Sequence, residues 1–116
     1  MTVENFYILI GGNYEKIIQN LKDDKRVIRF AKMLLEDTSY QELKSAMDAG
    51  DYEAGFAAAH KLKGICQNMY FEGMQNIVHD ITEGLRNGAD IPTAQALMPK
   101  LEEFYQLTVD GIQELD

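Results

Sequence analysis

The stretch DYEAGFAAAHKLKGICQNM, residues 51–69, decides the fold of this chain. On a helical wheel of about 100° per residue, its apolar side chains gather on one face, and His60 lies nearly opposite them. That apolar face consists of Ala58, Leu62, Ile65, Cys66 and Met69. A helix with one apolar face has to be covered by other elements, so the segment predicts a helix packed against further helices.

The flanking sequence predicts helices throughout. Apolar residues at helical spacing, with capping residues at the ends, indicate helices at about 2–10, 13–21, 25–36, 39–49, 72–87 and 92–114. No stretch alternates apolar and polar residues as a half-buried strand would. We therefore expect an all-α fold, an antiparallel up-and-down four-helix bundle with short extra N-terminal helices. In this single domain, 1–116, residues 1–22 are expected to form an N-terminal helical extension and residues 25–116 the bundle core.

Several residues carry signals for helix ends. Ser39 followed by Glu42 matches a capping box, which predicts that a helix opens at Ser39. Gly50 is expected to end that helix, and Asp51 to cap the start of the next one. Pro99 has no N–H to donate to the carbonyl of residue 95, so we expect it to kink the last helix or to restart it.

Composition and charge narrow the function classes. With 116 residues, 46% of them hydrophobic and 26% charged, the chain is typical of one globular domain. The apolar run FYILI is too short to cross a membrane, and no basic segment precedes it as in a signal peptide. The single cysteine, Cys66, excludes an internal disulfide, and we expect a cytoplasmic protein. A net charge of −8 disfavours nucleic acid and anionic membranes as partners.

His60 has two informative neighbours on the exposed side of the wheel. A neutral imidazole in contact with water is a nucleophile near pH 7. Gly64 costs a helix roughly 1 kcal/mol relative to alanine, but it leaves one flank of the imidazole uncovered. Lys63 can bring an ammonium group toward an anion held on the ring. The spacing alone does not distinguish this arrangement from an ordinary polar helix surface.

The string Ala59-His60-Lys61-Leu62-Lys63-Gly64 resembles the A-H-x-L-K-G signature of histidine-containing phosphotransfer (HPt) domains. The resemblance continues upstream in Gly50-Asp51-Tyr52 and downstream in Asn68-Met69 and Met74. It covers about residues 25–87, and the closing helix is compatible with it.

This resemblance implies that His60 accepts a phosphoryl group from an aspartate of a receiver domain and passes it to another. It also implies that Lys63 stabilises the phosphate charge and that Gly64 leaves space for the receiver. From the wheel we add Gln67 as a hydrogen-bond donor to the ring or the phosphate, and Phe56 and Lys61 as partner-binding residues.

The resemblance further describes a phosphoryl carrier without kinase activity of its own. The expected partner is the receiver domain of a response regulator, or that of a hybrid sensor kinase. No cofactor is expected on this chain, because Mg²⁺ belongs to the receiver in this family. In agreement, neither the G-x-x-x-x-G-K-[ST] nor the G-x-G-x-x-G phosphate-binding motif occurs. We expect a stand-alone monomeric carrier.

One departure leaves an alternative open. Ten residues after the histidine the family usually has glycine, whereas this chain has Tyr70. Because tyrosine resists positive φ, we expect the helix to run on or to turn by another geometry. A non-catalytic receiver-binding module that has lost transfer is therefore the alternative function. A third possibility is the dimerisation part of a sensor kinase, which is disfavoured because Lys61 follows the histidine in place of an acidic residue.

The other candidate residues have simpler interpretations. His79 lies off the apolar stripe of its helix and is interpreted as surface. A His60–His79 metal pair lacks a suitably spaced third ligand, so no metal site is expected. Cys66 falls in the apolar stripe and is expected to be an inert core residue.

Overall fold

The computed structural model describes residues 1–115, and within this range every regular element is helical. The all-α prediction is therefore confirmed. In chain order the elements are α1 (Val3–Leu9), α2 (Tyr14–Leu21), α3 (Asp24–Lys32), the 3₁₀ helix η1 (Met33–Glu36), α4 (Ser39–Ala49), α5 (Tyr52–Met69), α6 (Glu72–Leu85), the 3₁₀ helix η2 (Arg86–Gly88) and α7 (Ile91–Gln113).

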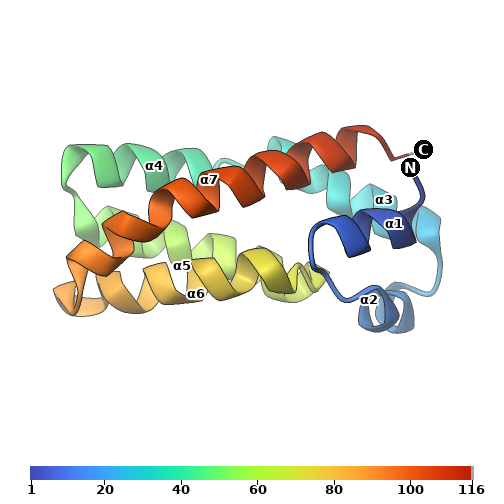
Figure 1. Cartoon of the computed structure of the whole chain (residues 1–116), viewed down its shortest axis with the longest axis horizontal. Helices are drawn as coiled ribbons and strands as arrows, with labels where there is room; N and C mark the ends of the chain where they lie inside the picture. Colours follow the sequence, from blue (N-terminus) through green and yellow to red (C-terminus); the bar gives the residue numbers. More distant parts are fainter. Residues whose placement is uncertain (116) are drawn as a thin grey trace.

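The long helices α4 to α7 form the bundle. Each packs against the next along the chain, and successive helices run in opposite directions (Figure 1). The fourth side is closed where Tyr40 of α4 stacks on Tyr105 of α7, with ring centroids 4.1 Å apart and planes 12° apart. The exposed ion pair Lys44–Glu102 joins the same two helices at 3.7 Å. The bundle is thus a ring in which α5 and α6 share one edge and α4 and α7 the opposite edge.

The bundle interior is apolar and continuous. Its fully buried side chains come from all four helices and include Leu43, Leu62, Met74, Ile81 and Leu101. Burying a side chain of this size stabilises a fold by about 1.5–3 kcal/mol, so this interior is what holds the four helices together. Cys66 is buried in it, as the apolar stripe predicted.

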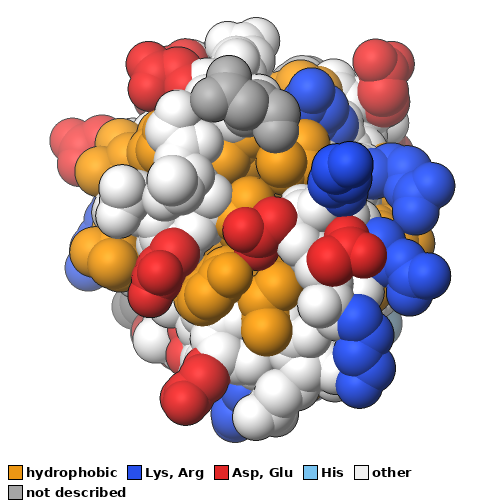
Figure 2. Space-filling model, turned by 90° about the vertical axis from the view of Figure 1, so that its right-hand side faces the viewer, with side chains coloured by type: hydrophobic (Ala, Val, Ile, Leu, Met, Phe, Trp, Pro, Cys, Tyr) orange, Lys and Arg blue, Asp and Glu red, His pale blue; other side chains and the backbone are white. Residues whose placement is uncertain are grey.

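The short helices α1, α2 and α3 gather at one end of the bundle, beside both chain termini (Figure 1). Phe6 and Tyr7 of α1 are fully buried there, and their rings lie 6.0 Å and 5.7 Å from that of Phe71, which follows α5. Apolar side chains are exposed in the middle of this end, and Lys and Arg side chains gather along one side of it (Figure 2). The most exposed large apolar side chain is Ile8 of α1, at 71%.

The start of α4 differs from the predicted capping box. Thr38, not Ser39, is the N-cap, and the cap position makes no side-chain hydrogen bond to the helix backbone. Ser39 is the first helical residue and is buried, and its N–H donates to Oδ1 of Asp37 at 2.8 Å. The Glu42 carboxylate accepts instead from the Thr38 hydroxyl at 2.8 Å. An aspartate two residues before the helical N–H has replaced the reciprocal bonds of the box.

The end of α5 overturns the expectation for Tyr70. The helix ends at Met69, and Tyr70 adopts the left-handed conformation with φ 56° and ψ 38°. The Phe71 N–H donates to the carbonyl of Cys66 at 3.0 Å and the Tyr70 N–H to that of Gln67 at 3.3 Å. These are the two bonds of a Schellman motif, which usually has glycine at this position. The chain therefore makes the usual helix stop with a tyrosine.

The remaining helix-end predictions have mixed outcomes. Gly50 ends α4 with φ 70°, and the Asp51 side chain caps α5 by accepting from the Ala54 N–H at 3.1 Å, both as predicted. Of the two outcomes expected at Pro99, a kink or a restart, the restart does not occur, because α7 continues through this residue. Within residues 1–115, no helix combines the length and the apolar character needed to cross a membrane.

Candidate functional site

Helix α5 holds the candidate site because one of its faces is fixed in the core. Gly55, Ala58, Ala59, Leu62, Cys66 and Met69 are its buried residues. Gly55, Ala58 and Ala59 are small, and an added Cβ at Gly55 would be in ordinary van der Waals contact with Leu85, at 3.5 Å. A helix anchored along this face presents its opposite face in a fixed orientation.

His60 lies on that opposite face and is exposed, as the wheel predicted. Gly64 follows one turn later, and a Cβ built there would meet no atom within 4 Å. The space at Gly64, one turn from the imidazole, is therefore open. A reactant as large as a protein domain can reach the ring from this side.

Lys63 lies beside His60 on the side of α6. It is half-buried, and among residues 1–115 it has no carboxylate partner within the 4.0 Å of an ion pair. The hydrogen bond from Arg86 is the main cause that lowers the pKa of the Glu83 carboxyl on α6, and the charge of Lys63 makes a smaller contribution in the same direction. Lys63 thus carries a positive charge one helical turn from His60, and within the described residues it forms no ion pair.

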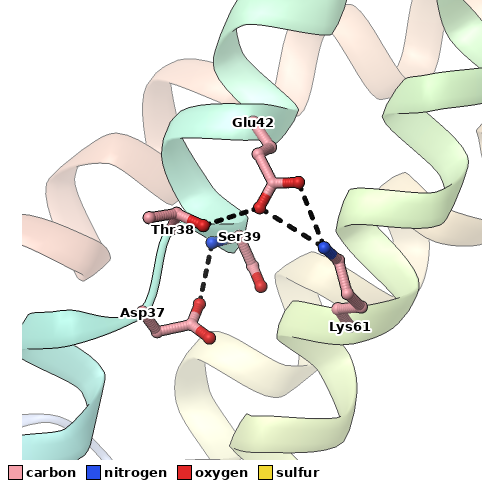
Figure 3. Close-up of polar contacts among 5 residues, drawn as sticks. All are labelled: Asp37, Thr38, Ser39, Glu42 and Lys61. Carbon is pink, nitrogen blue, oxygen red and sulfur yellow. Dashed lines mark hydrogen bonds and ion pairs between the residues drawn. The ribbon is translucent and has the colours of Figure 1, made fainter.

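Lys61 behaves differently from Lys63. Its ammonium donates to both oxygens of Glu42, at 3.1 Å and 3.3 Å, and so links α5 to α4 (Figure 3). The Thr38 hydroxyl also donates to Glu42. The hydrogen bond from Thr38 is the largest cause that lowers the pKa of the Glu42 carboxyl, and the hydrogen bond from Lys61 is the next. The charge of Lys61 is therefore partly balanced by Glu42 of α4. The ammonium of Lys63 instead lies on the α6 side of the helix, where it interacts with Glu83.

Phe56 precedes His60 by one turn and is half-buried. Its ring centroid lies 6.1 Å from that of His60, with the planes 30° apart. The guanidinium carbon of Arg86, at the end of α6, lies 4.9 Å from the centroid of the same ring. Glu83 accepts from Nε and Nη2 of Arg86 at 3.1 Å and 3.4 Å. The structure thus brings Phe56 together with a cation on the edge that carries His60.

Gln67 is exposed two turns beyond His60, a rise of about 10 Å along the helix. It lies on the expected face, but no hydrogen bond joins it to the imidazole within the described chain. His79 is exposed on α6, and its charge contributes to the low pKa of Glu83. Of the predicted residues, Phe56, Lys63 and Gly64 lie within about one turn of His60 on α5, whereas Gln67 lies two turns away.

Sequence reasoning missed Glu83 and Arg86. The only local signal was their spacing of three residues on a helix, which indicates an ion pair but not its location. Their position beside Phe56 follows from the packing of α6 against α5, which no pattern within either helix specifies. Within residues 1–115, no group of three or more His, Cys, Asp or Glu is arranged to hold a metal ion.

Comparison with models of known protein families matches residues 31–114 to the Hpt domain. The match includes η1, α4 to α7 and every residue of the candidate site, and it leaves α1, α2 and most of α3 outside. No curated protein and no solved structure gives a match to the chain.

Proposed function

The chain belongs to the Hpt domain family of histidine phosphotransfer domains in two-component signalling, and on this premise we propose that His60 is its phosphoacceptor. The observation that carries the proposal is the exposed imidazole on a helix fixed in the core, with open space at Gly64. His79 has no comparable setting, because Thr82 and Glu83 stand three and four residues after it, at the positions where Lys63 and Gly64 follow His60.

The proposed reaction is a transfer between an aspartyl phosphate and an imidazole. A ring nitrogen of neutral His60 attacks the phosphorus with its lone pair, an N–P bond forms, and the P–O bond to the aspartate breaks. The aspartate leaves as a carboxylate, and the imidazole holds the phosphoryl group until a second aspartate attacks it in the reverse sense. The chain acts as a covalent carrier.

The surroundings of His60 suit this chemistry. Phosphoryl transfer requires mainly in-line positioning and stabilisation of charge on the phosphoryl oxygens. The fixed helix provides the positioning, and the ammonium of Lys63, which forms no ion pair within the described residues, provides the charge stabilisation. We propose that the Mg²⁺ used in the transfer is held by the partner receiver domain and not by this chain.

The partner we propose is the receiver domain of a response regulator, with the receiver of a hybrid kinase as a second donor or acceptor. Hpt domains typically interact with receiver domains. The alternative of a binding module without transfer rested on Tyr70. Since Tyr70 makes the same left-handed helix stop as glycine does, it gives no reason to expect that transfer is lost.

Labelling by a phosphorylated receiver domain tests the proposal. Incubation with ³²P-labelled receivers from the source genome should transfer acid-labile, base-stable label to the wild-type chain. His60→Gln should take no label, and the matched control His79→Gln should be labelled like wild type. Label on His60→Gln, or receiver binding with no transfer to wild type, would contradict the proposal. A second, unphosphorylated receiver added to the labelled chain tests whether the phosphoryl group is passed on.

A further inference from the structure

Arg86 occupies an unusual place for a surface arginine. Its guanidinium carbon lies 4.9 Å above the Phe56 ring, and that ring is itself the neighbour of the His60 imidazole, 6.1 Å between centroids. A guanidinium over an aromatic face is attracted by the ring quadrupole and is less free to move than one in solvent. The cation is therefore fixed next to the phosphoacceptor edge.

Glu83 fixes the orientation of this cation. It engages Nε at 3.1 Å and Nη2 at 3.4 Å, so that one side of the planar group is occupied. The Arg86 side chain remains 48% exposed. A guanidinium has five N–H donors, so several stay available for a second acceptor.

The surface around Arg86 is concave. A cleft of about 460 Å³ is bounded by the first turns of α5 and by the turn that follows α6. Its lining residues are Tyr52, Glu53, Phe56, Leu85, Arg86, Asn87 and Gly88. Phe56 belongs both to this cleft and to the surroundings of His60, so the cleft and the phosphoacceptor surface are continuous.

We propose that Arg86 recognises the receiver domain, pairing with an acidic side chain of the receiver that enters this cleft when the phosphoryl group is delivered to His60. The inference rests on the proposed function, because it takes the donor to be a receiver. A protein that presents an aspartyl phosphate brings negative charge to this edge, and a planar guanidinium is the side chain best suited to bind a carboxylate. Phe56 and Glu83 are the positioning residues for it.

The kinetic consequence is specific. Arg86 contacts the partner and not the reacting phosphorus, so its loss weakens the complex without slowing the chemical step. We expect Arg86→Gln to raise the KM for phosphorylated receiver by about tenfold and to leave kcat unchanged. Arg86→Lys should recover part of the loss, since an ammonium keeps the charge but lacks the planar fork.

The chain offers a matched control. Lys44 and Glu102 form an ion pair of similar exposure, 52% and 60%, on the opposite edge of the bundle between α4 and α7. Lys44→Gln removes the same charge from a surface that the proposal does not use. Its KM should equal that of wild type.

The test measures initial rates of label transfer from a phosphorylated receiver to wild type, Arg86→Gln, Arg86→Lys and Lys44→Gln at several salt concentrations. A raised KM for Arg86→Gln alone, with a weaker salt dependence than wild type, supports the proposal. Equal KM values for Arg86→Gln and Lys44→Gln overturn it and leave the function of His60 standing. An equal loss of kcat in Arg86→Gln and Arg86→Lys would assign Arg86 a structural role. Failure of wild type to take label overturns both proposals.

Discussion

The backbone N–H of Asn13 donates a 2.9 Å hydrogen bond to the carbonyl of Tyr70, and so joins the N-terminal extension to the end of the helix that carries His60. Gly12 permits this approach, because a Cβ there would lie 3.0 Å from the same carbonyl oxygen and 2.6 Å from the Tyr7 ring. The Tyr70 hydroxyl also accepts from Asn20 at 3.3 Å. Contacts from outside the family-matched region therefore hold Tyr70 in a conformation that tyrosine disfavours.

Substitutions at Tyr70 test this explanation. Tyr70→Val should lower the free energy of unfolding by about 2 kcal/mol, because a β-branched residue is strained at φ 56°. Tyr70→Gly should stay within about 1 kcal/mol of wild type, since relief of backbone strain offsets the lost ring contacts. Urea denaturation measures both variants. A glycine variant less stable than the valine variant would show that backbone strain does not decide stability at this position.

Tyr7 makes the second link between the extension and this helix. Its buried hydroxyl donates to the Met69 carbonyl at 2.8 Å, and burial raises its pKa above the ordinary value of 10.0. Tyr7→Phe leaves that carbonyl without its partner and should cost about 1–2 kcal/mol in chemical denaturation. Phosphoryl labelling of His60 should be unaffected, because the imidazole lies several turns away. Unchanged stability would contradict the role assigned to the bond.

Substitutions at Gly64 should raise stability and lower activity. Gly64→Ala and Gly64→Gln should each raise the free energy of unfolding by up to about 1 kcal/mol, because an added Cβ meets no atom within 4 Å and glycine is a poor helix former. Labelling should slow in the order glycine, alanine, glutamine, by roughly tenfold or more for glutamine, as the open flank of His60 is covered.

Gly73→Ala is the contrasting control for this pair of variants. A Cβ there would lie 2.8 Å from the Ile10 carbonyl oxygen and 3.0 Å from the Phe104 ring. It should lower thermal stability by the equivalent of about 1–3 kcal/mol. If Gly64→Gln is labelled as fast as wild type, the space beside His60 is not needed for transfer.

Because its thiol is buried, Cys66 should make the folded chain less stable at alkaline pH. Burial raises the pKa of its thiol from 9.0 to about 12, so between these values the unfolded chain releases a proton that the folded chain retains. The release of this proton has little effect on stability below about pH 9. Above that pH it lowers the free energy of unfolding by at most about 1.4 kcal/mol per pH unit. Cys66→Ala should be less stable than wild type near neutral pH, because it leaves a cavity. In denaturation from about pH 8 to about pH 11, the difference between the two proteins should shrink, and parallel curves would contradict the prediction.

The sequence alone determined the helices and the orientation of the phosphoacceptor helix. Apolar spacing separates the buried Leu62 and Cys66 from the exposed His60, since a regular helix fixes the angle between any two of its residues. The same regularity places Gly64 beside His60, and the local motif identifies the family. These features depend only on contacts within one helix or on its amphipathic pattern.

Only the tertiary structure decided which residues of other helices join this surface. The packing of α6 on α5 brings Arg86 over Phe56, and that of α4 on α5 brings Glu42 to Lys61. Tyr70 is the clearest case: its local preference predicted no left-handed stop, yet hydrogen bonds and packing from residues more than fifty positions away hold it there. Local propensity is worth about 1 kcal/mol at such a position, and several long-range contacts acting together exceed it.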